Sequence, residues 1–204
     1  MPPDNSHRLV LASASPARRA LLTAAGIDAD VLVSGVDESV VEAHDASTLS
    51  LSLARMKARA VAARLQAEPG VLVLGCDSVL AFDGEVLGKP ADAAEAVKRW
   101  QAMRGHSGVL HTGHHLTELV GGRHAEGVGA TVVHFADVPD EEIDAYVATG
   151  EPLQVAGAFT IDGRGGAFVE RIEGDSGNVI GLSLPLLRRL LGELGLSITD
   201  FWRD

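Results

Sequence analysis

The run from Val71 to Ser78 constrains the fold most, because it is the strongest strand candidate in the chain. Its residues are apolar almost without interruption up to Asp77, a pattern typical of strands that are buried on both faces of a parallel or mixed sheet. We expect the strand to end at Asp77, which would place this carboxylate at the sheet edge, where open α/β folds bind ligands. There it would hold a metal or act as a base. The alternative is an aspartate that caps a turn.

A second strand candidate, residues 9–12, leads directly into a predicted helix. Ser15 is a good N-cap, and Pro16 falls at the first helical position, where its missing N–H costs nothing. Gly26 is expected to close this helix. A helix start presents free N–H groups and the positive end of the helix dipole, and both favour an anion.

Hydroxyl and guanidinium groups surround that helix start. Ser13 and Ser15 add hydroxyls, and Arg18 and Arg19 add positive charge. At helical spacing Arg18 shares a face with Leu22 and is predicted to point inward, whereas Arg19 lies about 100° round the axis. The arrangement suits a phosphate. The alternative is an ordinary capped helix with two solvated arginines.

Residues 47–66 are predicted to form a helix, because their apolar residues repeat at alternating spacings of four and three and define one stripe. The stripe consists of Leu49, Leu53, Met56, Ala60 and Ala63. Lys57 lies at its border, whereas Arg55 and Arg59 face away. Lys57 either lays its stem along the core while its ammonium stays in water, or serves as a ligand for an anion.

Lys89 follows a predicted hairpin, residues 82–90, whose turn signal is Asp83-Gly84. The sequence from Gly84 to Lys89 is not a P-loop, because its spacing differs and Pro90 stands where that motif has Ser or Thr. Lys89 is therefore either an anion-binding point charge or an ordinary exposed lysine. Glu38, in the turn-like segment 34–39, is likewise either a site residue or a solvated acid.

The other elements follow from periodicity together with glycine, proline and acidic caps. Strands are expected at 27–33 and 127–136, and helices at 92–103, 137–149 and 182–194. The segment 153–168 is dense in glycine within strand-like sequence, which a nucleotide pocket and a bulged hairpin would both use. Five histidines lie between 106 and 124, but their spacing does not match a closed zinc site, and adjacent His114 and His115 would face opposite sides of a strand.

Composition bounds the class of protein. The 204 residues are 46% hydrophobic, which is enough for one large domain or two joined lobes. The net charge of −11 argues against a nucleic-acid polymer or an anionic membrane as partner, and no apolar run is long enough to span a membrane. A single cysteine, Cys76, suits a reducing compartment, so a cytoplasmic location is expected. Residues 1–7 are expected to be flexible.

In their order and spacing, these segments resemble the Maf family of nucleoside triphosphate pyrophosphatases over nearly the whole chain. The motifs are LASxSP with nearby arginines, VDE ending at Glu38, KAxA from Lys57, GxD ending at Asp77 and followed by Ser78, GEVLGKP containing Lys89, AGxFxxxG from Ala156, and GLxLP from Gly181. The resemblance implies an α/β fold of the Maf/ITPase type, a mixed twisted sheet with flanking helices and two lobes around a central cleft, as a single domain over residues 1–204. Members often form homodimers.

The resemblance further implies conversion of a nucleoside triphosphate to the monophosphate and pyrophosphate with a divalent metal, Mg²⁺ or Mn²⁺. It places Ser13, Glu38, Lys57, Asp77 and Lys89 in the active-site cleft. Asp77 would position or deprotonate the water, with or without contacting the metal, and Glu38 would hold the metal. The two lysines, with Arg18 and the helix N-terminus, would carry the phosphate charge.

Two departures from the family pattern concern substrate binding. Ala17 stands where many members have the first arginine of a pair, so Arg18 matches the more constant arginine and Arg19 lies one place beyond it. Residues 153–163 would contact the base. Ser15, Arg19 and Ser78 are further expected substrate-binding residues. Here Asp162 replaces the Gln found in members resembling thymidine and uridine triphosphate hydrolases, so the base preference stays open.

Two other functions compete with hydrolysis to pyrophosphate. One is a nucleotide-responsive regulator of cell division and septum formation that acts by binding rather than by turnover. The other is a phosphatase that would release inorganic phosphate and leave the diphosphate. The products of the reaction separate these three functions.

Overall fold

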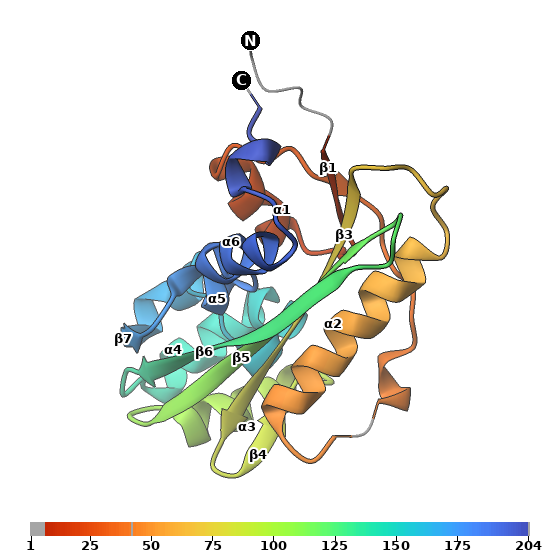
Figure 1. The fold of residues 1–204 in the computed structure, drawn as a ribbon. Coiled ribbons are helices and arrows are strands. Elements are labelled where there is room, and N and C mark those ends of the chain that lie inside the picture. Colours follow the sequence, from red (N-terminus) through yellow and green to blue (C-terminus); the bar gives the residue numbers. More distant parts are fainter. Residues whose placement is uncertain (1–6, 42, 204) are drawn as a thin grey trace. The chain divides into compact units, whose positions relative to one another are not determined.

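The computed structural model describes residues 7–41 and 43–203 (Figure 1). The chain forms two compact units. Unit 1 comprises the described residues of 1–77, 112–129 and 181–204, and unit 2 comprises 78–111 and 130–180. The single domain over 1–204 stays a prediction, and the flexible start falls, except for His7, outside the described residues.

Seven strands form one mixed sheet among the described residues, which confirms the predicted α/β class. They are β1 (Arg8–Leu11), β2 (Asp30–Val31), β3 (Val71–Phe82), β4 (Glu85–Leu87), β5 (Ser107–Glu118), β6 (His124–Phe135) and β7 (Val169–Glu173). Their order is β2-β1-β3-β5-β6-β7, and β4 pairs with β3 off this path. β1 is parallel to both β2 and β3, whereas the β3–β4 and β6–β7 pairs are antiparallel.

Helices flank the strands (Figure 1). The α-helices are α1 (Pro16–Ala24), α2 (Ala46–Ala62), α3 (Ala93–Met103), α4 (Asp140–Ala148), α5 (Ser176–Ile180) and α6 (Leu184–Glu193). Short 3₁₀ helices are η1 (Glu38–Val40), η2 (Glu151–Gln154), η3 (Ala156–Ala158), η4 (Arg164–Phe168) and η5 (Ile198–Phe201). Side chains of Ser15, Asp45, Asp92 and Ser183 cap α1, α2, α3 and α6. None of the helices described is long and apolar enough to cross a bilayer.

The first half of β3 is covered on both faces within unit 1, as its apolar sequence predicts. Leu72 and Leu74 pack in a cluster with residues of α1 and α6, including Leu22 and Leu187. The alternate residues, Val71 and Val73, pack with Ala58 and Val61 of α2. Alternation along the strand therefore places two helical layers on opposite faces of β3. Unit 2 has its own core, with Trp100, Phe135, Tyr146 and Phe159 among its buried residues.

Close contact between α2 and the sheet is possible because two strand residues lack a side chain. A Cβ on Gly75 of β3 would lie 2.1 Å from the carbonyl oxygen of Ala54. A Cβ on Gly113 of β5 would lie 2.3 Å from the carbonyl oxygen of Ser50. These distances are far below van der Waals contact, so only glycine lets the helix approach this closely.

That approach corrects the predicted stripe of α2. The buried residues are Ala46, Ser50, Leu53, Ala54, Lys57, Ala58 and Val61, and of the predicted stripe only Leu53 is among them. Small side chains face the sheet because the helix lies so near it, and Leu49 and Met56 are turned aside. Lys57 therefore lies within the buried face rather than at its border. The helix also ends at Ala62 rather than at residue 66.

Three other expectations were wrong in detail. The strand predicted at 27–33 is reduced to β2, because only Asp30 and Val31 pair with β1. β3 does not end at Asp77 but continues to Phe82, because its last residues pair with β4 across the predicted Asp83-Gly84 turn. The segment 153–168 forms three 3₁₀ helices rather than strand, and β7 and α5 follow where no element was predicted.

Candidate active site

The start of α1 has the predicted architecture. Ser15 caps the helix, with its Oγ 3.4 Å from the backbone N–H donor of Arg18. The Oγ of Ser13 accepts a hydrogen bond from the Ser15 N–H at 3.2 Å. The two hydroxyls and the helix N-terminus therefore lie together at the end of β1, as an anion site requires.

Arg18 points inward, as helical spacing predicts, and is 9% exposed. Its Nε donates to the Gly181 carbonyl at 2.7 Å, and its Nη1 donates to the Cys76 carbonyl at 3.0 Å and to Ser13 Oγ at 3.1 Å. Arg18 thus connects the start of α1 to β3 immediately before Asp77. Arg19 is exposed on the other side of the helix.

Three of the predicted catalytic residues meet in one ion cluster. Lys57 Nζ, on α2, lies 2.5 Å from Asp77 Oδ1 on β3 and 2.8 Å from Glu38 Oε1 on η1. The side chains of Lys57 and Asp77 are each 10% exposed, whereas that of Glu38 is 53% exposed. The cluster therefore has one buried carboxylate and one that reaches solvent.

Burial is the main influence on the chemistry of Asp77. It raises the pKa of the Asp77 carboxyl above its ordinary value, and the charges of Lys57 and Arg18 oppose this without cancelling it. A carboxylate with a raised pKa accepts a proton more readily, which suits a general base. Burial also raises the pKa of the neighbouring Cys76 thiol to about 12, so this cysteine is an inert core residue rather than a nucleophile.

The resemblance implies a divalent metal, and Asp77 and Glu38 are the residues of the cluster that would hold it. Lys57 contacts one oxygen of each carboxylate, so Oδ2 of Asp77 and Oε2 of Glu38 are the atoms that would ligate a cation. Among the described residues no group of three or more His, Cys, Asp or Glu side chains is placed to hold a metal. Mg²⁺ usually takes one or two carboxylates and completes its coordination with water and substrate phosphates. A Mg²⁺ held by Asp77 and Glu38 would therefore need water and phosphate oxygens to complete its coordination.

The remaining predicted residues belong to unit 2. Ser78 follows Asp77 on β3, where alternation directs its side chain to the opposite face. Lys89 is exposed in the loop after β4, and Asp162 is exposed between η3 and η4.

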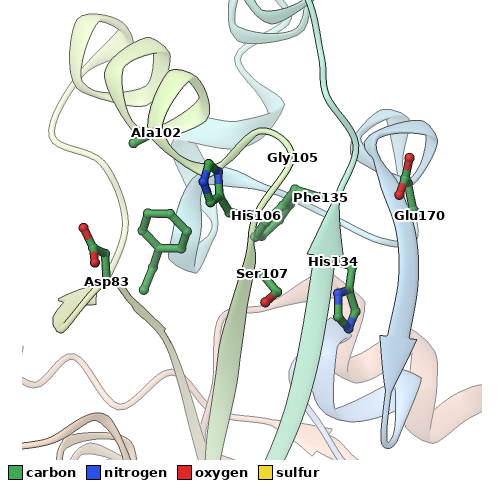
Figure 2. A pocket seen from close by; sticks show the side chains of 9 residues that line it. Asp83, Ala102, Gly105, His106, Ser107, His134, Phe135 and Glu170 are labelled. Atoms are coloured by element: carbon green, nitrogen blue, oxygen red, sulfur yellow. The ribbon is translucent and has the colours of Figure 1, made fainter.

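A pocket in unit 2 involves none of the predicted residues (Figure 2). Its labelled lining includes His106, Ser107, His134, Phe135 and Glu170. Phe82 also lines the pocket. His106 Nδ1 already lies 2.8 Å from the Arg104 carbonyl, and His134 Nε2 lies 2.9 Å from a carboxylate oxygen of Glu173. The two histidines of this pocket therefore already pair with neighbouring groups.

Sequence reasoning missed the glycines that position the cluster. Gly75 brings α2 down onto β3, and a Cβ on Gly181 would lie 2.9 Å from Arg18 Nε. Gly75 stands within the GxD motif and Gly181 within the GLxLP motif, so the signal was in the sequence. The sequence alone did not reveal which neighbouring group each glycine makes room for.

Comparison with known proteins identifies the family. Residues 8–194 match the family described as Maf-like protein. A Salinispora tropica protein named nucleoside triphosphate pyrophosphatase is 66% identical, over 96% of this chain and 87% of that protein. Proteins with the same name from Streptomyces coelicolor and Microcystis aeruginosa are 58% and 53% identical, over 99% and 95% of this chain and 98% of each relative. The chain belongs to the Maf family.

Proposed function

We propose that this protein hydrolyses nucleoside triphosphates to nucleoside monophosphate and pyrophosphate, and that non-standard nucleotides are among its substrates. The observation that carries the proposal is the buried Asp77, held by Lys57 beside the polar start of α1. The printed name of the relatives, nucleoside triphosphate pyrophosphatase, supports the same reaction.

Asp77 is the proposed base. A water that attacks phosphorus must lose a proton, and the raised pKa of Asp77 lets its carboxylate take that proton. Lys57 donates to Oδ1 and so holds the carboxylate in one orientation. Orientation of this kind contributes to catalysis because the reacting groups meet without further loss of freedom.

The substrate brings about four negative charges, which the protein must offset. The N–H groups at the start of α1, with Ser13, Ser15 and Arg18, supply donors for phosphate oxygens. Lys57 adds a cation, and Lys89 and Arg19 are proposed to add further ones. A divalent cation held by Asp77 and Glu38 would neutralise phosphate charge and polarise the phosphorus centre.

Base recognition is proposed for unit 2. Residues 153–163, which include Asp162, are proposed to contact the base, and Ser78 is proposed as a further substrate-binding residue. Gly157 in this segment has a φ of 70° and packs against Leu80, where a Cβ would lie 2.8 Å from the leucine side chain, so the glycine fixes the path of the segment within unit 2. Asp162 accepts hydrogen bonds only, so a base with exocyclic N–H donors is favoured.

Three finer proposals rest on the sequence and the resemblance. They are a homodimer, a cytoplasmic location and Mg²⁺ or Mn²⁺ as the metal. Sedimentation velocity tests the first, localisation of a tagged chain the second, and metal titration of turnover the third. A nucleic-acid polymer remains an unexpected partner because the net charge is −11.

One assay tests the reaction. Purified protein is incubated with a panel of normal and modified triphosphates and Mg²⁺ or Mn²⁺, and the products are identified. We expect monophosphate and pyrophosphate in equal amounts. Diphosphate with inorganic phosphate would instead indicate a phosphatase. Stoichiometric binding without product would indicate the cell-division regulator, which the names of the relatives do not favour.

A further inference from the structure

The loop that joins β4 to α3 carries Lys89 and is short (Figure 1). Lys89 itself is exposed, whereas Pro90 beside it is buried. A lysine side chain is flexible, and it serves as a phosphate ligand only if the backbone that carries it is fixed. Hydrogen bonds to the backbone hold the loop on both sides of Lys89.

On the side before Lys89, the loop is held through the Gly88 carbonyl. Nη1 of Arg99, on α3, donates to this oxygen at 2.6 Å. The Gly157 N–H, in the glycine-rich segment, donates to the same oxygen at 3.1 Å. The Arg99 side chain is 13% exposed, so its hydrogen bond is largely shielded from water. One carbonyl thus ties the Lys89 loop both to α3 and to the proposed base-recognition segment.

On the side after Lys89, the loop is held by Glu95, one helical turn before Arg99. Its Oε2 accepts the Ala91 N–H at 2.6 Å, and its Oε1 pairs with Nη2 of Arg99. The spacing of four residues places the two side chains on one face of α3. The hydrogen bonds from the Ala91 N–H and from Arg99 hold the pKa of Glu95 below its ordinary value, so Glu95 stays charged at neutral pH.

We propose that Arg99 and Glu95 are positioning residues that fix the loop on both sides of Lys89 and so present its ammonium to a triphosphate. The inference rests on the proposed function. It extends that function by giving a positioning role to two side chains that are not proposed to contact the substrate. It also links the phosphate-binding lysine to the base-recognition segment through the shared Gly88 carbonyl.

A double-mutant cycle tests the link between Arg99 and Lys89. We expect Arg99→Ala to raise KM for the triphosphate about tenfold with a much smaller change in kcat, because a loosened loop weakens binding. Arg99→Lys should recover part of this loss, because a lysine can still donate to Gly88. Lys98→Ala, which removes the same charge from the exposed preceding residue of α3, should leave KM unchanged.

The decisive comparison is made in the Lys89→Ala background. If Arg99 acts through Lys89, the double variant has the same KM as Lys89→Ala alone. If Arg99→Ala raises KM by the same factor in the Lys89→Ala background as in the unmodified protein, the proposal is overturned. A Lys89→Ala variant with the same KM as the unmodified protein would also overturn the proposal. The proposed function would still stand in that case, provided that the unmodified protein releases pyrophosphate.

Hydrogen exchange separates failure of this inference from failure of the proposed function. The Ala91 amide should exchange faster in Arg99→Ala and Glu95→Ala than in the unmodified protein and in Lys98→Ala. This readout needs no turnover, so it holds even if no pyrophosphate is released. Unchanged exchange at Ala91 in both variants would show that the two side chains do not hold the loop.

Discussion

Of the three cations on helix α2, Lys57 and Arg55 each meet a carboxylate of the sheet in unit 1. Lys57 contacts Asp77 of β3 at 2.5 Å. Arg55, two residues earlier and on another side of the helix, pairs with Glu126 of β6 through two hydrogen bonds of 3.0 and 2.6 Å. The two pairs have similar groups and similar distances, but they differ in how much water reaches them.

The solvent exposure of each pair determines the chemical role that its carboxylate can have. Both side chains of the Lys57–Asp77 pair are 10% exposed, whereas Arg55 and Glu126 are 34% and 28% exposed. Burial raises the pKa of Asp77, while the hydrogen bond from Arg55, helped by His115, lowers that of Glu126 to about 2. Asp77 is thus prepared to accept a proton, and Glu126 remains a fixed anion that holds α2 on the sheet.

The largest effect is expected from Asp77→Asn. The amide keeps the shape of the side chain but cannot take a proton from water, so turnover should fall by about 10² to 10⁴. Glu126→Gln is the matched control and should retain activity. Steady-state rates of both variants, with thermal melts to verify folding, make the measurement. Near-normal turnover by Asp77→Asn would remove Asp77 from the chemistry.

Next in size is the loss of the buried cation. Lys57→Met leaves Asp77 buried without its partner, so the free energy of unfolding should fall by about 3 kcal/mol. Arg55→Met should cost less, because water already reaches that pair. The pKa of Asp77 should also rise, which would move the acidic limb of the rate profile to higher pH. Urea titrations measure the stability of both variants. Equal losses of unfolding free energy in Lys57→Met and Arg55→Met would contradict the expected difference between the two ion pairs.

The smallest effect concerns acid stability. The pKa of Glu126 is lower in the folded protein than its ordinary value of 4.5, so its contribution is complete above about pH 4.5 and declines as the pH falls toward 2. Glu126→Gln should therefore flatten the decline in unfolding free energy over that range. Denaturant titrations at several pH values provide the test, and an unchanged slope would show that the Arg55 pair does not depress this pKa.

Local signals were predictable from the sequence. Ser15 and Pro16 fix the start of α1 because a cap and a first-turn proline act within one helical turn. The inward position of Arg18 follows from its spacing to Leu22 on the same helix. The Asp83-Gly84 turn was predictable for the same reason, since both residues adopt positive φ angles that the dipeptide favours.

Features set by distant contacts were not predictable. The buried face of α2 depends on Gly75 and Gly113 in strands far along the chain, and apolar periodicity on the helix selected the wrong stripe. The 3₁₀ turns of 153–168 depend on α3, because Trp100 Nε1 donates to the Ala158 carbonyl at 2.7 Å. The ion cluster of Lys57, Asp77 and Glu38 also depends on contacts between distant segments. Only the family resemblance indicated that these three residues lie together.

The central claim is that a water activated by Asp77 attacks the α-phosphorus and expels pyrophosphate. Hydrolysis in water enriched in ¹⁸O, followed by mass spectrometry of both products, tests it most directly. We predict one ¹⁸O atom in the nucleoside monophosphate and none in the pyrophosphate. Label in the pyrophosphate would show attack at the β-phosphorus and would contradict the account.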